Sequence, residues 1–217
     1  TIDHVVSIFQ DVCRLDVEPD GLEFDADHVR GERIKEDAEY EGIRIDMTAC
    51  LGKTRLPIQI DIGFADVITP APASLDYPAI LDFPAPQLYG YPPETIIAEK
   101  FHAMTVLGMA NSRMKDFYDI WMLITNFEFS GETVQRALER TFQNRETELP
   151  AETHVIFSRE FAENKAEQWR AFAKKIREEN EIEMKKIVRV IRELFIPVLY
   201  ASQHGKLFKK RWKKKWK

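Results

Sequence analysis

The stretch EGIRIDMTACLGKTRLPIQIDIGF, residues 41–64, decides the fold of the first part of this 217-residue chain. Polar and apolar residues alternate in IRIDM and again in IQIDIGF, which is the period of a half-buried β-strand. Gly52 and Lys53 lie between the two runs, and glycine favours a turn there. We therefore expect the two runs to pair as a hairpin, with a third strand upstream in HVRGERI, residues 28–34.

The sequence predicts helices both before and after these strands. In DHVVSIFQDVCR, residues 3–14, the apolar positions recur every three or four residues, which predicts a helix. Pro93 suits the first turn of a helix, and Ser112 is a potential helix cap. Further helices are expected over residues 94–107, 113–126, 131–143, 158–178 and 181–196. These patterns predict an α+β protein: a small mixed sheet with helices, followed by a C-terminal helical domain.

A proline-rich segment separates the strands from the later helices. Seven prolines fall within residues 70–93, and proline both removes a backbone donor and restricts its predecessor. We expect an extended linker with Ile80, Leu81 and Phe83 as short apolar anchors. The predicted organisation is a strand-rich part over 1–69, a linker over 70–93, a helical domain over 94–200 and a basic tail over 201–217.

The charge is unevenly distributed along the chain. The formal net charge is −5, yet residues 206–217 read KLFKKRWKKKWK, with eight basic residues and no acidic one. An acidic body is a poor generic partner for nucleic acid, because phosphate contacts need local cations. We expect the tail to drive nucleic-acid adhesion, with Phe208, Trp212 and Trp216 as stacking surfaces. Such a segment is also suited to anionic membranes.

Several protein classes lack support in the sequence. Cys13 and Cys50 stand alone, which argues against a disulfide scaffold or a cysteine zinc site and suits a reducing cytoplasm. No apolar run is long enough to span a membrane, and no secretory signal is visible. The spacings typical of zinc hydrolases, P-loops, dinucleotide-binding folds and serine hydrolases are not found.

Two residues stand out as potential chemical groups. Asp61 alternates with Ile60 and Ile62, so it lies on the opposite face of the expected strand. It is either a solvated surface residue or a rigidly held magnesium ligand. Lys100, in ETIIAEKFHAM, lies beside an apolar helical stripe. Its amine either reaches out to water or presents a cation to a polyphosphate.

The third place is NSRMKDFYDIW, residues 111–121, where charges crowd the expected start of a helix. Asp116 and Asp119 are three residues apart and share a helix face, as do Arg113 and Asp116. A local surface salt bridge of under ~1 kcal/mol is one interpretation. The other is an anion site, because Arg113 and Lys115 lie near exposed helical N–H groups and the positive end of the helix dipole.

A family resemblance connects these places. LGKTRLPIQIDIGFAD (51–66), LYGYPPETIIAEKFHAMTVLGMANSRMKDFYDIW (88–121) and FAENKAEQWRAF (161–172) closely resemble the AbiEii/AbiGii toxin family of nucleotidyltransferases. The resemblance implies a fold like that of polymerase-beta-type nucleotidyltransferases and Mg²⁺-dependent transfer of a nucleotide from a nucleoside triphosphate. The implied acceptor is RNA, with tRNA as the expected one, and the implied protein partner is a cognate antitoxin.

The resemblance also assigns residues by position. Asp61 corresponds to the third metal-site carboxylate, and Lys100 to the phosphate-binding lysine. Asp116, with Arg113 and Lys115 beside it, corresponds to the last family motif. The basic position before the Asp61 strand is Lys53. The resemblance thus makes Asp61, Lys100 and Asp116 catalytic, and Lys53, Lys100, Arg113 and Lys115 nucleotide-binding.

The sequence departs from the family pattern in its first motif. A Gly-Ser step followed by two aspartates separated by one residue opens that pattern, and neither is found in residues 1–217. Ala65 also stands where the family usually has glycine. We therefore expect these 217 residues, as a member that begins late, to transfer nucleotides poorly or not at all. The alternatives are a degenerate module that binds antitoxin or RNA without catalysis, and a metal-dependent nuclease that uses Asp61.

Overall fold

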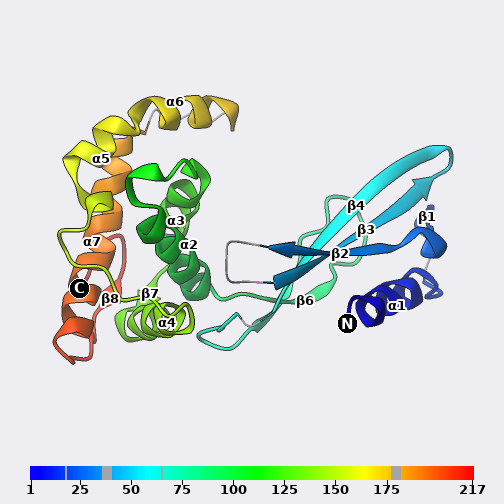
Figure 1. Cartoon of the computed structure of the whole chain (residues 1–217), viewed down its shortest axis with the longest axis horizontal. Helices are drawn as coiled ribbons and strands as arrows, with labels where there is room; N and C mark the ends of the chain where they lie inside the picture. Colours follow the sequence, from blue (N-terminus) through cyan, green and yellow to red (C-terminus); the bar gives the residue numbers. More distant parts are fainter. Residues whose placement is uncertain (18, 36–40, 65, 177–181) are drawn as a thin grey trace. The chain divides into compact units, whose positions relative to one another are not determined.

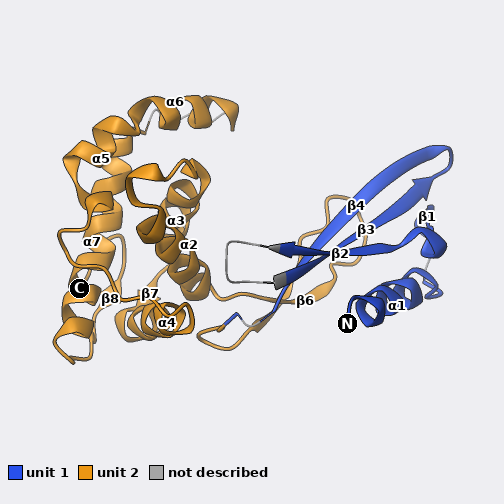
Figure 2. Cartoon of the chain, viewed as in Figure 1, with its two compact units in different colours: residues 1–66 blue, residues 67–217 orange. Residues whose placement is uncertain are grey.

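The protein divides into two compact units, residues 1–66 and 67–217 (Figure 2). The computed structural model describes residues 1–17, 19–35, 41–64, 66–176 and 182–217. Both units combine helices with antiparallel strands, so the expected α+β class is confirmed. In the described part of the chain, no helix has the length and apolar composition that a membrane span needs.

Unit 1 is a four-stranded antiparallel sheet with one long helix (Figure 1). The predicted hairpin is confirmed, because Leu51 pairs with Thr54 across the turn and the pairing runs on to Gly42 and Gly63. One edge of the central strand β3 pairs with β4, and the other pairs with β1 and β2. The elements are α1 (Ile2–Cys13), β1 (Leu22–Phe24), η1 (Ala26–His28), β2 (Arg30–Lys35), β3 (Glu41–Leu51) and β4 (Thr54–Gly63).

Alternation along the hairpin gives the sheet one apolar and one polar face. The core contains Ile43, Ile45 and Met47 of β3, and the alternate isoleucines of β4 pack against it. Helix α1 covers this face, where a side chain on Gly31 would lie 2.7 Å from a methyl group of Val6. The glycine therefore permits the close approach of α1, and the opposite face keeps the polar residues.

Unit 2 is mostly helical (Figure 1). Its core is built around the last helix, from which nine residues are buried, and the rings of Phe101 and Phe195 stack at 3.8 Å between centroids. The helices are α2 (Pro93–Leu107), α3 (Met114–Asn126), α4 (Gly131–Asn144), α5 (Arg159–Asn164), α6 (Ala166–Lys175) and α7 (Met184–Gln203). Unit 2 also contains two short 3₁₀ helices, η2 (Gly108–Ala110) and η3 (Val155–Phe157).

Some helix boundaries differ from those expected. The helix predicted over 158–178 is two helices with Lys165 between them, and its expected end lies outside the described residues. The last helix continues seven residues beyond the predicted end at 196 and includes Pro197. Burial of Val198 and Leu199 explains this, because packing of the apolar face offsets the backbone bond that proline removes. Ser112 does not cap α3, which begins at Met114.

The proline-rich segment contains a short hairpin of β5 (Ala73–Asp76) and β6 (Gln87–Gly90). The residues expected to anchor it do not do so: Ile80 is fully exposed, and Leu81 and Phe83 are more than half exposed. Thr69 is instead held in the interior, where the Thr95 hydroxyl donates to its carbonyl at 2.9 Å and accepts from its amide at 2.9 Å. The segment is thus fixed to α2 by polar contacts just before its prolines.

The last residues of the chain fold back onto unit 2. Two-residue strands, β7 (Phe129–Ser130) and β8 (Arg211–Trp212), pair with each other although more than eighty residues separate them in sequence. The Trp212 side chain is wholly buried, and its indole donates to the carbonyl of Ile124 at 2.7 Å. The expectation that Trp212 offers a stacking surface to nucleic acid is therefore wrong, because the ring belongs to the core.

Candidate functional site

A cluster of charged side chains joins helices α2 and α3. Lys100 of α2 places its Nζ 2.9 Å from Oδ1 of Asp116 and 2.7 Å from Oδ2 of Asp119, both on α3. Two further cations flank this centre: Nε of Arg113 lies 3.1 Å from Oδ2 of Asp116, and Nζ of Lys115 lies 2.6 Å from Oδ2 of Asp119. The structure thus brings together Lys100, Asp116, Arg113 and Lys115, four of the residues predicted from the sequence.

Local sequence positions the cluster. A three-residue spacing puts both aspartates on one face of α3, and buried Ile97 and Phe101 fix the face of α2 from which Lys100 extends. At the start of α3, Oδ1 of buried Asn111 accepts a hydrogen bond from the Arg113 amide at 2.7 Å. This bond holds the backbone that carries the flanking cations, but it does not cap the helix, because Arg113 is the N-cap residue and receives no side-chain cap bond.

The electrostatics of the cluster favour the charged forms. Burial by itself would lower the pKa of Lys100, but the hydrogen bonds that its ammonium donates to Asp119 and Asp116, together with their negative charges, outweigh burial and raise it. For Asp119, burial would raise the pKa, and the bonds from Lys100 and Lys115 lower it instead. Lys100 is therefore a protonated, fixed cation at neutral pH, and its side chain does not extend away to water as a snorkelling lysine would.

The cluster has an inner and an outer part. The side chain of Asp116 is 6% exposed, and its Oδ2 receives no hydrogen bond from the described residues although Arg113 Nε is near. By contrast, the side chains of Arg113 and Lys115 are 55% and 71% exposed. Three cations surround two carboxylates, so one positive charge remains. This arrangement can present cations to an external anion while the aspartates hold Lys100 in place.

Asp61 lies in the other unit, on the polar face of the sheet. Its carboxylate accepts two hydrogen bonds from the guanidinium of Arg44 on β3, from Nε to Oδ1 at 2.8 Å and from Nη2 to Oδ2 at 2.9 Å. This bidentate bond lowers the pKa of Asp61. Both carboxylate oxygens are therefore engaged by a cation of the neighbouring strand.

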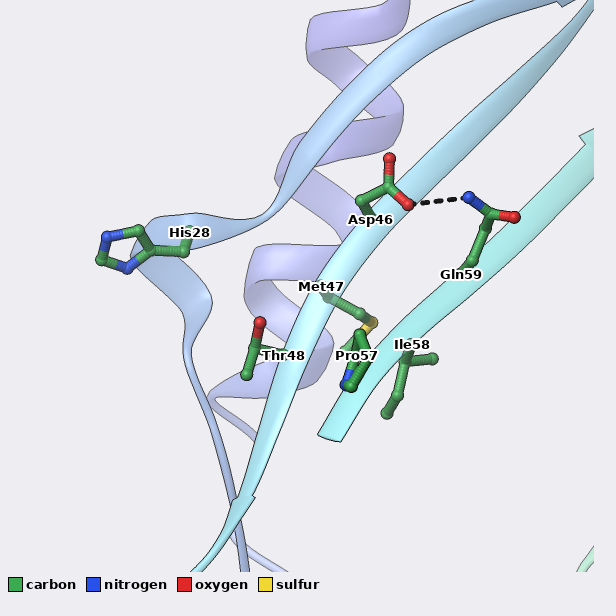
Figure 3. A pocket seen from close by; sticks show the side chains of 7 residues that line it. All are labelled: His28, Asp46, Met47, Thr48, Pro57, Ile58 and Gln59. Carbon is green, nitrogen blue, oxygen red and sulfur yellow. Dashed lines mark hydrogen bonds between the residues drawn. The ribbon is translucent and has the colours of Figure 1, made fainter. Parts of the chain in front are cut away.

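A second carboxylate lies on the same sheet face. Oδ1 of Asp46 accepts from the Gln59 amide at 3.0 Å, and the two residues line a shallow pocket of about 390 Å³ (Figure 3). Register places Asp46 diagonally from Asp61, at a separation of roughly 7–8 Å for such neighbours. Alternation in the IRIDM run was the sequence signal for Asp46, because it puts this residue on the face of Arg44.

These oxygen atoms do not by themselves form a magnesium site. Mg²⁺ requires near-octahedral oxygen ligands at about 2.0–2.1 Å. Asp61 is bound by Arg44 and Asp46 by Gln59, and no group of three or more acidic, histidine or cysteine side chains gathers anywhere in the described residues. The donor set on this sheet face therefore matches a polar surface network and not a complete metal site.

The predicted set of site residues and the α2–α3 cluster differ at two positions, Lys53 and Asp119. Lys53 is exposed in the turn of the β3–β4 hairpin, eight residues before Asp61 and hence roughly 25 Å away along the strand. Asp119, by contrast, is central to the cluster although the family resemblance does not point to it. Its signal was available, since the helical spacing that linked it to Asp116 also predicts a shared partner.

Comparison with known proteins gives a family. Residues 1–191 match the family model described as nucleotidyl transferase AbiEii toxin, type IV toxin–antitoxin system. Searches of curated proteins and of solved structures gave no match. The family match covers the Asp61 strand, the α2–α3 cluster and only the first part of α7, up to residue 191. The chain therefore belongs to the AbiEii family of nucleotidyl transferase toxins of type IV toxin–antitoxin systems.

Proposed function

We propose that this chain binds a nucleoside triphosphate at the start of α3 and serves the transfer of a nucleotide to an RNA acceptor, with tRNA as the expected RNA. The single observation that carries the proposal is the α2–α3 cluster, in which two aspartates fix Lys100 and two exposed cations flank it. Family membership supplies the class of reaction.

Each residue of the cluster has a proposed role. Lys100, Arg113 and Lys115 contact the phosphates and offset the negative charge that moves during transfer. Asp116 and Asp119 are positioning residues, because each bonds Lys100 and orients its ammonium. In this proposal Asp116 acts by holding Lys100 and not by contacting the reacting groups.

Mg²⁺ is proposed as the cofactor from the family alone. Asp61 would contribute one oxygen ligand, which requires Arg44 to release it, and the described residues do not supply the rest of the set. Type IV toxin–antitoxin membership supports a cognate antitoxin as the protein partner. Lys53, on the hairpin turn, would contact a part of the nucleotide or RNA remote from Asp61.

The test measures transfer of label from radiolabelled triphosphates to total tRNA with Mg²⁺. Residues 1–217 alone are expected to label RNA weakly or not at all, because one carboxylate cannot organise the metal ions for in-line transfer. Activity is expected when a segment carrying the Gly-Ser step and the aspartate pair precedes Thr1. In that active form, Lys100→Gln and Asp116→Asn should each lower transfer by at least about tenfold.

The control is Glu132→Gln, an exposed acidic residue in the first turn of α4 that lies outside the cluster. Thermal unfolding of every variant separates loss of fold from loss of activity. Transfer at the parental rate by folded Lys100→Gln and Asp116→Asn would remove the cluster from the mechanism. Robust labelling by residues 1–217 alone would contradict the expected need for the aspartate pair.

A binding module without catalysis is the second candidate. The observation in its favour is that Arg44 occupies both oxygens of Asp61 and no three metal ligands gather in the described residues. Such a module would retain antitoxin or RNA while transferring nothing. The same transfer assay distinguishes the two, because restoring the first motif would leave a module inactive.

A further inference from the structure

The last twelve residues present their cations on a fixed scaffold. We call residues 211–217 the basic hairpin. Its two tryptophans point inward: the indole of Trp212 donates to the carbonyl of Ile124, and the indole of Trp216 donates to the carbonyl of Leu194 at 2.9 Å. The two rings meet edge to face at 5.2 Å between centroids. These contacts fix the hairpin to α3 and α7.

The same geometry holds like charges opposite each other. The Arg211 amide donates to the Lys217 carbonyl at 3.2 Å, and the Lys217 amide donates back to the Arg211 carbonyl at 3.0 Å. Nearer the turn, the Lys213 amide donates to the Lys215 carbonyl at 3.0 Å. Residues next to inward tryptophans point outward, and all four of these cations are exposed. Like charges directly opposite each other are destabilising. The tryptophan anchors thus hold together cations that would otherwise separate.

One carboxylate lies against this positive surface. Oε1 of Glu128 is 2.8 Å from Nζ of Lys213, and that hydrogen bond, assisted by the charges of Arg211 and Lys217, lowers the pKa of Glu128. Within the described part of the chain, no other acidic side chain forms an ion pair with the hairpin. The surface therefore keeps an excess of positive charge.

We propose that the basic hairpin binds the phosphate backbone of the RNA acceptor. The inference deepens the proposed function, on which its choice of RNA rests, and it concerns a segment beyond the residues 1–191 that match the family. Binding is electrostatic and independent of base sequence, because the Trp212 ring is buried and the half-buried Trp216 ring packs against the core with its indole bonded to Leu194. The same orientation disfavours a lipid surface, where tryptophans would need to point outward.

The test measures binding of a short fluorescent polyuridine RNA to the full chain by anisotropy over a range of salt concentrations, without triphosphate. The hairpin variant carries Gln in place of the four cations that flank the tryptophans: Arg211, Lys213, Lys215 and Lys217. A matched control carries Gln at one exposed arginine and three exposed lysines elsewhere in unit 2: Arg136, Lys174, Lys175 and Lys186.

The hairpin variant should lower the slope of log K against log salt by about 3, at roughly 0.7 per lost single-strand contact, and weaken binding on the order of 100-fold near 0.1 M salt. The control should keep most of the parental slope. Glu128→Gln should tighten binding, because it removes the opposing carboxylate and frees Lys213. Tryptophan fluorescence and thermal unfolding report whether the hairpin stays folded in each variant.

Three outcomes would overturn the inference: no RNA binding by the parent, equal losses in the hairpin and control variants, or no gain from Glu128→Gln. Vesicles of phosphatidylcholine and phosphatidylserine form the second arm. Tighter binding of the parent to vesicles than to RNA at equal phosphate concentration would assign the hairpin to membranes instead. The transfer assay tests Lys100 and Asp116, so failure of either account is distinguishable from failure of the other.

Discussion

At the residue scale, the protonation of Asp119 and Lys100 links the cluster to stability. The pKa of Asp119 is lowered from 3.8, so its stabilisation is present above 3.8 and is lost as the pH falls from there through the lower pKa of the folded state. The pKa of Lys100 is raised from 10.5, so its stabilisation is present below that value and lost only at higher pH. Between these limits the cluster should contribute a constant stabilisation.

We therefore expect Asp119→Asn to lower the free energy of unfolding by about 1–2 kcal/mol at neutral pH. Its difference from the parent should shrink below about pH 4, where Asp119 becomes protonated first in the unfolded chain and, at still lower pH, in the folded protein. Urea unfolding across this pH range provides the measurement, and Asp82→Asn, an exposed carboxylate in the proline-rich segment, provides the control. A difference that stays the same from acid to neutral pH would mean that Asp119 is not paired.

At the element scale, Gly131 decides whether the chain end docks on α4. A side chain there would lie 2.5 Å from Cδ1 and 2.6 Å from the carbonyl oxygen of Phe208, and 2.8 Å from the carbonyl oxygen of Lys210. The Gly131 amide also donates to the Lys210 carbonyl at 2.7 Å. Gly131→Ala should therefore displace residues 206–217 and cost about 1–3 kcal/mol, as overpacking does.

Hydrogen exchange measures this displacement directly. Amides of the basic hairpin should exchange faster in Gly131→Ala, while those of α2 keep their protection. Gly63→Ala is the matched control, since a side chain there would meet its nearest neighbour at an ordinary 3.6 Å. Parental protection of the hairpin in Gly131→Ala would show that the close approach is not what fixes the segment.

The elements also differ in how far the sequence predicts them. Alternation and a glycine turn predicted the β3–β4 hairpin because both signals are local. The break at Lys165 has no glycine or proline to mark it, and α7 runs through Pro197 because burial outweighs local preference. The β7–β8 pair joins segments distant in sequence, so only tertiary packing of Trp212 determines it. Local patterns cannot predict such pairings.

At the scale of the whole molecule, the candidate site residues are divided between the units. Asp61 and Lys53 belong to residues 1–66, and the Lys100 cluster belongs to residues 67–217. Family resemblance selected Lys100 and Asp116 by position, and the structure pairs their side chains. The engagement of Asp61 by Arg44 was not predicted, because it depends on which residues of two strands lie opposite each other. Register is a property of the folded sheet.

The proposed triphosphate site at the start of α3 can be tested through Arg113 and Lys115 without disturbing the fold. Both side chains are mostly exposed, so replacing them should change stability by under ~1 kcal/mol, whereas removing Lys100 would leave the buried Asp116 without its closest cation. Titration calorimetry of a nucleoside triphosphate into the parent and into Arg113→Gln/Lys115→Gln provides the measurement. Lys174→Gln/Lys175→Gln, a pair of exposed lysines in the last turn of α6, is the control.

If the site binds the phosphates, the parent and the α6 control should bind the triphosphate alike, and Arg113→Gln/Lys115→Gln should bind at least about tenfold more weakly, a loss of roughly 1.4 kcal/mol. Equal affinity of the parent and the folded α3 variant would contradict the proposed site, as would an equal loss in the control.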